Sequence, residues 1–348
     1  MSTFAEYKAM RLPTPRQFGL EDIEKAVQDY EAIIELQASG FRAYSQGRVS
    51  VPPVQSMGQA PFHSFISGAE AQTCVKSGYI EGDEHYVIKI APGGVRENEE
   101  KGLPVNTGLN LLFSQRTTRL EAIFFDEGLL TEIRTAAAAA LAARLFAPCG
   151  EALREVGVLG SGVQARWQLR LLKAVTPCRR ALVHARDPAR VQRFCEDMRS
   201  EGWEVRPASL EELASRCQLI HTVTTSRAPL LRRAWLPVGE AVHVNAMGAD
   251  VPGKQELEPA LVASADLLVC DSLAQTFERG EFRAAAAEGL VDRGRVLELG
   301  TVLERPELHR QPVKDARLTI FDSSGVAVQD VMITRMVYEA LVAPRAHL

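Results

Sequence analysis

Hydrophobic and polar positions along the chain change their period near residue 130. From residue 156 onward, short apolar runs alternate with segments of helical period. The apolar runs predict strands at 156–159, 180–184, 203–206, 219–223, 241–245 and 267–270. The segments between them predict helices that run to about 174, over 188–199 and over 210–215. Such alternation is typical of a parallel sheet covered by helices on both faces.

The N-terminal part, before residue 130, has a different pattern of predicted elements. A helical stripe covers 21–39 and is predicted to end at Gly40. Short strands separated by turn residues then indicate one mixed or antiparallel sheet, with strands at 62–66, 70–77, 85–90, 108–114 and 120–125. An alanine-rich helix over 131–146 follows, and an amphipathic helix over 325–342 is predicted to pack back onto the N-terminal sheet.

These patterns predict an α/β protein of two domains. One is a Rossmann-type doubly wound parallel sheet over 131–324. The other is a smaller α+β domain formed by 1–130 and completed by the C-terminal helix within 325–348. No linker or repeat separates them, so the boundary near 127–134 rests on the change of pattern alone.

Composition narrows the class of protein. The 348 residues are 46% hydrophobic and 24% charged with a net charge of −4, which argues against nucleic-acid binding. The longest apolar stretch, 136–143, is too short to span a membrane, and residues 1–20 have no apolar signal-peptide core. The six cysteines are scattered without a C-x-x-C pair, so we expect a reduced, cytoplasmic chain with buried thiols.

Gly160 and Gly162 stand with Ala165 in the spacing G-x-G-x-x-A, between an apolar run and a helical segment. The first glycine allows a tight turn from strand to helix, and the second lets the backbone approach a pyrophosphate. The alanine lets the helix lie close on the sheet, and the helix N-terminus offers unpaired N–H groups to phosphates. A plain strand-to-helix turn is the alternative, but the strand–turn–helix context favours a dinucleotide site.

Two cations in the N-terminal part are candidates for substrate binding. Lys89 shares a strand face with Val87, where a lysine needs an anionic partner or a route to solvent. The alternative is an edge-strand lysine that prevents pairing with another chain. Arg48 precedes an extended segment and is suited to clamping a carboxylate. On the residues alone, a surface arginine is the better interpretation of Arg48.

Other candidates lie at the ends of predicted elements. Arg134 lies near the start of the helix over 131–146, where the helix dipole disfavours a cation, so it indicates a bound anion such as a phosphate. Thr224 belongs to a hydroxyl-rich strand end that either faces a cofactor or is held by local hydrogen bonds. Asp250 follows the strand at 241–245 and is predicted at the same edge of the sheet as the glycine turn. A loop aspartate is usually solvated, but Rossmann-type enzymes place catalytic groups at this edge. Ser323 or Ser324 is predicted to cap the last helix.

Several segments, in this order, resemble the ornithine cyclodeaminase/mu-crystallin family over nearly the whole chain. They are 86–89, 130–137, 160–165, 245–257 and 323–330. The resemblance implies a homodimer whose N-terminal sheets join at the interface, with the C-terminal helix returning to that domain. It also implies that 1–130 and 325–348 serve substrate binding and dimerisation, while 131–324 binds the dinucleotide.

The resemblance further implies roles at matching positions. Lys89 matches the lysine that contacts the substrate carboxylate or carbonyl, and Asp250 matches the acid/base aspartate. Arg48 is aligned with the substrate-carboxylate arginine, ahead of an insertion-like stretch at 70–84. The implied cofactor contacts are Arg134 at the phosphates, the backbone of Val163 and Gln164 after Gly160 and Gly162, and Thr224, Met247, Gly248, Lys254 and Ser323 at the nicotinamide and ribose.

One position departs from the NAD-dependent members of the family. These usually have an acidic residue at the end of the second strand that binds the adenosine ribose, and here Ala185 takes its place. Arg186 follows, as in members that accommodate a 2′-phosphate. The cofactor is therefore predicted to be NAD(P)H with NADP preferred. Asp187 bending back to the ribose would reverse that preference.

The predicted function is NAD(P)-dependent reduction of a small 2-imino or 2-oxo acid, or of a cyclic ketimine, to an amino acid. Arg48 and Lys89 hold the substrate carboxylate, and Asp250 delivers a proton directly or through water. A first alternative is an ornithine cyclodeaminase-type lyase, which returns the hydride and releases ammonia. That reaction needs a pocket acid for the distal amine, for which the sequence offers no confident candidate. A second alternative is a non-catalytic, crystallin-like binding protein. The presence of both Lys89 and Asp250 argues against it.

Overall fold

The computed structural model describes residues 13–58, 63–68, 71–95, 97–305, 307 and 317–343. The chain forms two compact units. Unit 1 draws on the ranges 1–26, 52–129 and 334–348, and unit 2 on 27–51 and 130–333. Helix α14 (Ala327–Val342) begins in unit 2, and its last part belongs to unit 1.

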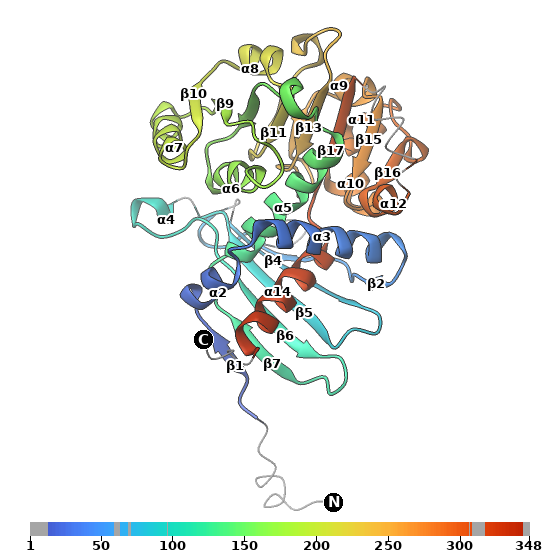
Figure 1. The fold of residues 1–348 in the computed structure, drawn as a ribbon. Coiled ribbons are helices and arrows are strands. Elements are labelled where there is room, and N and C mark those ends of the chain that lie inside the picture. The colour runs from blue at the N-terminus through green and yellow to red at the C-terminus, as the bar shows by residue number, and fades with distance from the viewer. Residues whose placement is uncertain are drawn as a thin grey trace, which may run out of the picture. The chain divides into compact units, whose positions relative to one another are not determined.

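Unit 1 is built on a mixed sheet in which neighbouring strands follow the order β1–β7–β6–β5–β4, with β3 also paired to β4 (Figure 1). All pairs are antiparallel except the parallel pair of β1 with β7. The strands are β1 (Arg16–Phe18), β3 (Gln55–Met57), β4 (Gln72–Ile80), β5 (His85–Gly93), β6 (Leu109–Ser114) and β7 (Leu120–Phe124). Its short helices are α2 (Leu20–Ala26) and α4 (Glu97–Glu100).

The two faces of this sheet differ in burial. On the inner face the central strands place buried side chains at Val87, Lys89, Asn110, Leu112, Ala122 and Phe124. The outer face carries partly exposed and mostly apolar side chains at Tyr86, Ile88, Ile90, Leu109, Leu111, Phe113 and Ile123. Period-two alternation therefore holds in these strands, but the outer face is far more apolar than a solvated sheet face needs to be.

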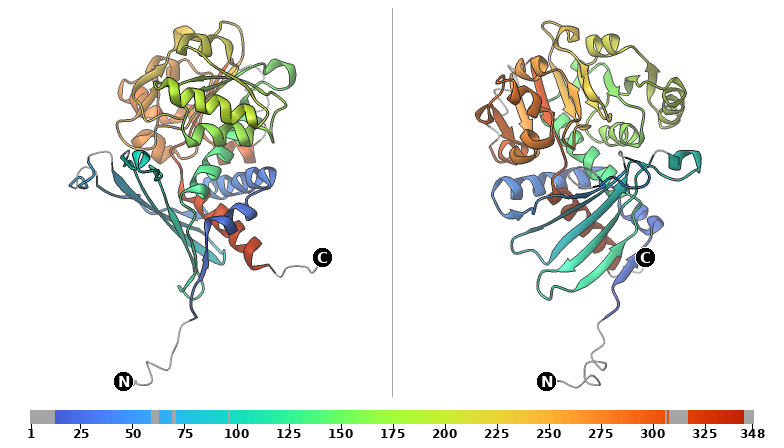
Figure 2. Two further views of the ribbon diagram at one scale, coloured as in Figure 1. Left: turned by 90° about the vertical axis from the view of Figure 1, so that its left-hand side faces the viewer. Right: turned by 180° about the vertical axis from the view of Figure 1, so that it is seen from behind.

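The end of α14 packs on the inner face of the sheet, as predicted for the last helix (Figure 2). The ring of Tyr338 meets the ring of Phe124 edge-on at 6.5 Å between centroids, and that of His85 at 5.3 Å. Arg335 forms an ion pair with Asp83 in the turn between β4 and β5. The helix thereby covers the middle of the sheet with aromatic contacts.

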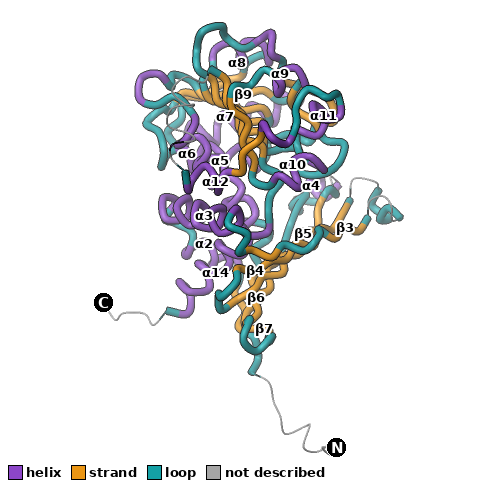
Figure 3. Tube along the Cα trace, turned by 90° about the vertical axis from the view of Figure 1, so that its right-hand side faces the viewer, coloured by secondary structure: helices purple, strands orange, loops and turns teal. Residues whose placement is uncertain are grey.

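Unit 2 is a wholly parallel sheet in the order β10–β9–β8–β11–β13–β17–β15–β16, with helices on both faces (Figure 3). Its strands are β8 (Val156–Leu159), β9 (Arg180–His184), β10 (Glu204–Pro207), β11 (Leu219–Thr222), β13 (Val242–Ala246), β15 (Leu267–Cys270), β16 (Val296–Glu298) and β17 (Leu318–Asp322). The main helices are α3 (Tyr30–Ser45), α5 (Leu129–Phe146), α6 (Val163–Leu172), α7 (Pro188–Ser200), α8 (Leu210–Arg216), α9 (Pro259–Ala263), α10 (Leu273–Arg279), α11 (Phe282–Ala287) and α12 (Leu299–Glu304).

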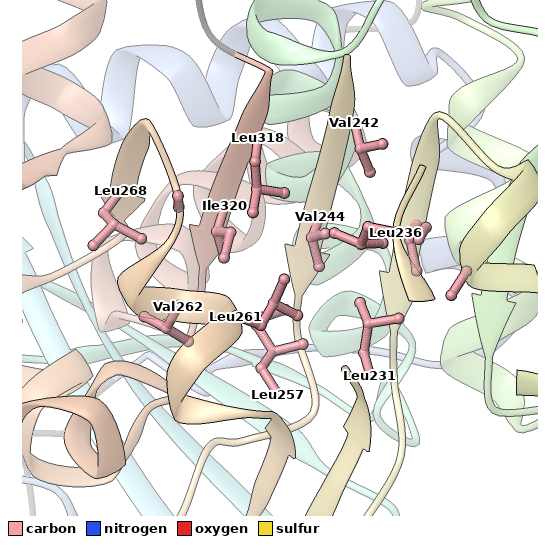
Figure 4. Packing of buried hydrophobic residues seen from close by; sticks show 14 of the residues in the cluster. Leu231, Leu236, Val242, Val244, Leu257, Leu261, Val262, Leu268, Leu318 and Ile320 are labelled. Atoms are coloured by element: carbon pink, nitrogen blue, oxygen red, sulfur yellow. The ribbon is translucent and has the colours of Figure 1, made fainter. Parts of the chain in front are cut away.

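Alternate residues of the parallel strands enter two separate cores. Val156 and Val158 of β8 join the core that includes α6 and α7, whereas Leu159 joins the core of α8, α9 and α11. In this second core, Val244 and Ile320 of adjacent strands point towards Leu261 of α9 (Figure 4). Because both faces are buried, the strands read as continuous apolar runs, which is why the sequence located six of the eight. Strands β16 and β17 were not predicted.

Three predictions about elements were wrong. The helical stripe over 21–39 is broken between α2 and α3, where the side chain of Asp29 accepts a hydrogen bond from the Ala32 N–H and caps α3. Gly40 lies inside α3, where its missing side chain makes room for Met332. In place of a strand at 62–66, the described residues form one bridge between Phe65 and Gly68, and residue 62 lies outside them.

Other features fell outside the sequence analysis or were only partly as expected. A small parallel pair, β12 (Arg227–Leu231) with β14 (Gln255–Leu257), was not predicted, nor was the short strand β2 (Val49–Ser50). All six cysteines are free thiols, but only Cys195, Cys217 and Cys270 are buried. Within the described part of the chain, we find no helix both long and apolar enough to cross a membrane.

Candidate cofactor and active site

The predicted cofactor residues of unit 2 gather at one edge of the parallel sheet. Strands β8, β11, β13 and β17 are neighbours, and all run in the same direction. Their carboxyl ends lead into the segments that hold Gly160, Thr224, Met247 and Ser323. In open α/β sheets this edge is where ligands bind. The sequence therefore placed these candidates on a common edge correctly.

The glycine turn after β8 has an open surface. Gly160 has a φ of +119°, and a Cβ there would lie 2.9 Å from the Val223 carbonyl oxygen, so only glycine fits. Gly162 caps the ten-residue helix α6 without a side-chain hydrogen bond, and its Cβ position faces open space. Helix N–H groups next to open space suit a dinucleotide pyrophosphate. The residues present therefore fit a nicotinamide dinucleotide.

Gln164 holds helix α6 in place through its side chain. Its amide donates to the Glu132 carbonyl of α5 at 3.0 Å and accepts from Gln168 at 2.9 Å. Trp167 also donates to the Glu132 carboxylate at 2.9 Å. Only the backbone of Val163 and Gln164 is thus left for the cofactor contact that the resemblance implies.

Arg134 is almost fully buried, with 4% of its surface exposed. Its Nε donates to Asp330 Oδ1 at 3.1 Å and its Nη1 to Gln329 Oε1 at 3.1 Å, both at the start of α14. The guanidinium lies so close to Gly325 that a Cβ there would be 2.7 Å from Nη1. The arginine is therefore held rigidly by an acid of its own unit, and phosphate binding by Arg134 stays a prediction.

The end of the second strand settles what Asp187 does. Its Oδ1 accepts from the Ala189 and Arg190 N–H groups at 2.9 and 3.2 Å, which caps helix α7. The carboxylate is thus committed to the helix. Arg186, one residue earlier, is exposed.

Glu256 is a central residue of this edge to which the sequence analysis gave no role. It is fully buried, and its carboxylate accepts from the Thr224 N–H at 2.6 Å, the Gly248 N–H at 2.9 Å and the Thr222 hydroxyl at 2.7 Å. A Cβ on Gly248 would lie 2.3 Å from this carboxylate, so the glycine is required for the close approach. One buried acid thus ties together the ends of β11 and β13.

Three further buried acids continue inward from Glu256. Glu281 accepts from the backbone N–H groups of Glu256 and Leu257 at 2.6 and 3.0 Å, and its own N–H donates to Asp322 at 3.1 Å. Asp271 accepts from the Ser323 hydroxyl at 2.8 Å and the Gly325 N–H at 2.7 Å. Ser323 and Ser324 therefore do not cap α14, contrary to prediction: Ser324 donates to Gln275 at 3.2 Å.

Burial raises the pKa of three of these acids. It brings the pKa of Asp322 to about 8 and raises that of Glu256, while burial and the nearby Glu256 raise that of Glu281 well above its usual value. In the same sheet, burial lowers the pKa of His221 to about 3 and of His243 to about 4. The raised pKa values of the acids favour their protonated forms, and the lowered values keep both histidines neutral, which reduces the charge that is buried at this edge.

These pKa values predict a loss of stability as the pH rises from about 7 to 8. The two histidines are neutral when folded and mostly neutral when unfolded in this range, but Asp322 keeps its proton when folded and loses it when unfolded, so rising pH favours unfolding. One such proton changes the free energy of unfolding by about 1.4 kcal/mol per pH unit below the folded pKa. Denaturant unfolding should show this slope, and Asp322→Asn should reduce it by about one proton. Exposed Glu204→Gln is the control, and an equal slope in Asp322→Asn contradicts the assignment.

Asp250 and Lys254 form an ion pair at the rim of the same edge. Lys254 Nζ donates to Asp250 Oδ1 at 2.6 Å, with the side chains 17% and 49% exposed. The pair follows Gly248, whose position is fixed by Glu256. Asp250 is therefore an accessible carboxylate on a loop anchored at its base, as a proton-transfer group requires.

Lys89 lies in unit 1, on the inner face of its sheet, and only 2% of it is exposed. It is not on an edge strand, because β5 pairs with both β4 and β6. The edge-strand interpretation is therefore wrong. Its neighbour across β6 is Asn110, whose amide donates to the buried Asp126 at 3.2 Å. Arg48, in unit 2, is exposed and donates to Gln46 at 2.7 Å, so its substrate role stays a prediction.

A parallel sheet with a glycine turn and open helix N-terminus at its carboxyl edge defines a Rossmann-type dinucleotide-binding protein. The Asp250 carboxylate after β13, at the same edge of the sheet, adds a group suited to proton transfer. The model of the ornithine cyclodeaminase/mu-crystallin family matches residues 21–344. The chain belongs to this family, as its sequence segments indicated.

Related sequences bear names from more than one branch of the family. A protein named uncharacterized cyclodeaminase y4tK, from Sinorhizobium fredii, is 34% identical over 310 residues, 88% of this chain and 89% of the relative. Alanine dehydrogenase from Archaeoglobus fulgidus is 33% identical over 324 residues, 92% of each chain. The similarity covers both units.

Solved structures agree with this placement. The iminosuccinate reductase of Paracoccus denitrificans in complex with NAD+ has a TM-score of 0.79 at 28% identity, covering 94% of this chain and 96% of the other. An archaeal alanine dehydrogenase dimer with bound NAD has a TM-score of 0.82 at 27% identity, covering 94% and 96%. The fold is therefore one that binds a nicotinamide dinucleotide in these neighbours.

Proposed function

We propose that this protein is an NAD(P)-dependent oxidoreductase that reduces a small 2-imino or 2-oxo acid, or a cyclic ketimine, to an amino acid. The observation that carries the proposal is the pairing of Asp250 with Lys254 on the loop after β13, at the edge that holds the open glycine turn. A dehydrogenase and an imine reductase among the similar proteins support it.

The bound dinucleotide supplies the hydride acceptor or donor. Gly160, Gly162 and the backbone of Val163 and Gln164 would hold its pyrophosphate, and Arg134 would bind its phosphates. The residues assigned to the nicotinamide and ribose are Thr224, Met247, Gly248, Lys254 and Ser323. Glu256 acts through them, since its hydrogen bonds fix Thr224 and Gly248.

The substrate is held through its carboxylate by Lys89 and Arg48, and Asp250 transfers the proton. A cation with little access to water binds a carboxylate more strongly than a solvated one, which favours the buried Lys89 as the main anchor. Lys254 orients the Asp250 carboxyl group by its hydrogen bond. Asp250 takes up a proton from solvent and passes it to the substrate nitrogen as the carbon accepts the hydride.

A cyclodeaminase is the second candidate, favoured by the relative named a cyclodeaminase at 34% identity. The two functions differ in whether they consume reduced cofactor. A reductase consumes one reduced cofactor for each amino acid formed, whereas a cyclodeaminase releases ammonia from a diamino acid without net oxidation.

The deciding experiment supplies 2-oxo acids with ammonia, cyclic imines and diamino acids to the purified protein, each with NADH and with NADPH. Cofactor oxidation and ammonia are measured in the same sample. The proposal predicts stoichiometric cofactor oxidation with an imine or with an oxo acid plus ammonia. Ammonia release from a diamino acid at constant cofactor concentration would instead establish the cyclodeaminase.

NADP is the proposed preferred cofactor, because Arg186 follows β9 while the neighbouring acid Asp187 is occupied in capping α7. We expect Arg186→Ala to lower kcat/KM for NADPH about 10- to 100-fold, the loss of a charge-assisted contact, and to leave kcat/KM for NADH nearly unchanged. Arg193→Ala, another exposed arginine on α7, is the matched control. Equal losses with both cofactors would contradict the assignment.

A homodimer is the proposed assembly, formed through the outer face of the mixed sheet. Partly exposed apolar residues such as Ile88, Leu111 and the stacked pair Tyr86–Phe113, 4.8 Å apart, support this choice of surface. The archaeal alanine dehydrogenase described as a dimer agrees with it.

A further inference from the structure

Arg166 lies in the first turn of helix α6 and contacts the glycine turn that precedes the helix. Its Nη1 donates to the carbonyl oxygens of Ser161 at 2.8 Å and of Gly162 at 3.2 Å. Its Nε and Nη2 both donate to Asp197 of α7, the Nε at 2.9 Å. The side chain is 19% exposed, and its guanidinium lies 5.4 Å from the ring centroid of the buried Phe194. All three guanidinium nitrogens are therefore engaged by the protein.

The position of this cation requires an explanation. The helix dipole disfavours a positive charge in the first turn, and the ion pair offsets this only weakly because the Asp197 side chain is 51% exposed. Arg170, one turn later on α6, makes a comparable bridge. It donates to Glu201 at the end of α7 at 2.9 and 2.7 Å and lies over the Trp167 ring. Arg166 differs from Arg170 in its hydrogen bonds to the carbonyls of the glycine turn.

Holding these two carbonyls fixes the direction of two N–H groups. A trans peptide unit is planar, so each N–H points away from the carbonyl of the preceding residue. The Ser161 and Gly162 carbonyls are directed at Arg166, and the N–H groups of Gly162 and Val163 are therefore directed to the opposite side. Because the first N–H groups of a helix have no partner within the helix, these two are suited to a phosphate.

The glycine turn has little rigidity of its own. Glycine has more backbone freedom to lose than any other residue. The Gly160 N–H is tied to the end of β9, where it donates to the His184 carbonyl at 2.8 Å, but Gly162 caps α6 without a side-chain hydrogen bond. A turn that must be ordered at each binding event lowers the affinity for its ligand. Arg166 supplies the rigidity that the glycines lack.

We propose that Arg166 is a positioning residue for the dinucleotide. It holds the glycine turn in the conformation in which the N–H groups of Gly162 and Val163 receive the pyrophosphate. This inference rests on the dinucleotide binding in the proposed function and not on the reaction. Because both cofactors contain the pyrophosphate, the loss of Arg166 should weaken NADH and NADPH alike. Arg186 is different, since it is proposed to bind the 2′-phosphate of NADPH alone.

The test measures the Kd of NADH and of NADPH by fluorescence titration of the purified protein. We expect Arg166→Met to raise both Kd values about tenfold or more, the contribution of charge-assisted hydrogen bonds, and to leave their ratio nearly unchanged. Arg170→Met is the matched control, because it removes an arginine that bridges the same two helices one turn further from the glycines. It should lower the free energy of unfolding by a similar amount and leave both Kd values unchanged.

Two results would overturn the inference and leave the proposed function intact. One is an unchanged Kd for both cofactors in a folded Arg166→Met protein. The other is an equal rise in Arg166→Met and Arg170→Met, which would show that only the packing of α6 on α7 matters.

A second pair of variants makes the same comparison if Arg166→Met does not fold. A lysine ammonium lacks the planar fork that reaches the carbonyls on one side and Asp197 on the other, so Arg166→Lys should raise both Kd values and Arg170→Lys should not. Equal Kd values in these two variants would overturn the inference. Dinucleotide binding without imine reduction would overturn the proposed reaction alone, and wild-type protein that binds neither cofactor would overturn both.

Discussion

Replacing Asp250 with asparagine is expected to lower kcat for imine reduction about 100- to 10,000-fold, the usual contribution of a positioned proton-transfer group. The amide retains the size of the side chain but cannot supply the proton that the substrate nitrogen takes up. Its loop remains anchored, because the hydrogen bond from Gly248 to Glu256 does not involve Asp250. Steady-state kinetics with the preferred imine, together with the cofactor Kd from fluorescence, measures the effect.

The control for this variant is Glu211→Gln, an exposed acid on α8 at a different part of unit 2. It changes the net charge by the same amount and should retain wild-type kcat. Wild-type activity in Asp250→Asn on every substrate would remove Asp250 from the mechanism. A loss of cofactor binding equal to the loss of kcat would make it a binding residue.

Lys89→Met should have the second largest effect. Methionine keeps the apolar stem of the buried lysine and removes its charge, so the sheet should still form. We expect kcat/KM to fall about 10- to 150-fold, chiefly through a higher KM, which is the value of one charge-assisted hydrogen bond to a carboxylate. Initial rates over a range of substrate concentration separate KM from kcat.

Lys25→Met on the exposed side of α2 is the matched control in the same unit. It should leave both kinetic constants unchanged. Inhibition by a carboxylic acid analogue should weaken in Lys89→Met in proportion to KM. An unchanged KM in a folded Lys89→Met protein would show that the substrate carboxylate is bound elsewhere.

The parallel sheet of unit 2 was the most predictable part of the molecule. Strands at 156–159, 180–184 and 267–270 were predicted to the residue. Their side chains are buried on both faces of the sheet. Packing therefore requires apolar residues at every position of the strand, and the sequence shows them as one continuous apolar run. The N-terminal helices were less predictable, because the cap at Asp29 interrupts a stripe whose apolar spacing continues across the break.

The role of the buried acids at the cofactor edge could not be predicted from the sequence. Glu256 lies in β14, which was not predicted. Its carboxylate is held by backbone N–H groups of Thr224 and Gly248, which follow β11 and β13. Glu281 is likewise held by the backbone of residues 256 and 257. Such partners are set by strand order, which no local pattern contains.

The pairing of Lys76 with Lys89 was hidden for a related reason. The sequence placed both residues in strands, but which residues face each other depends on the register fixed by the turn around Asp83. A register shifted by one residue would put Lys76 on the outer face.

The central claim is that this protein carries out net hydride transfer to an imine. The most direct test supplies NADPH that carries deuterium at both C4 positions of the nicotinamide, with the preferred imine or with oxo acid and ammonia, and analyses the product by mass spectrometry and NMR. A diamino acid is supplied in a parallel sample. We predict one deuterium at C2 of the amino acid for each cofactor molecule oxidised. A product without deuterium, or ammonia released from the diamino acid while the reduced cofactor stays constant, would contradict the claim.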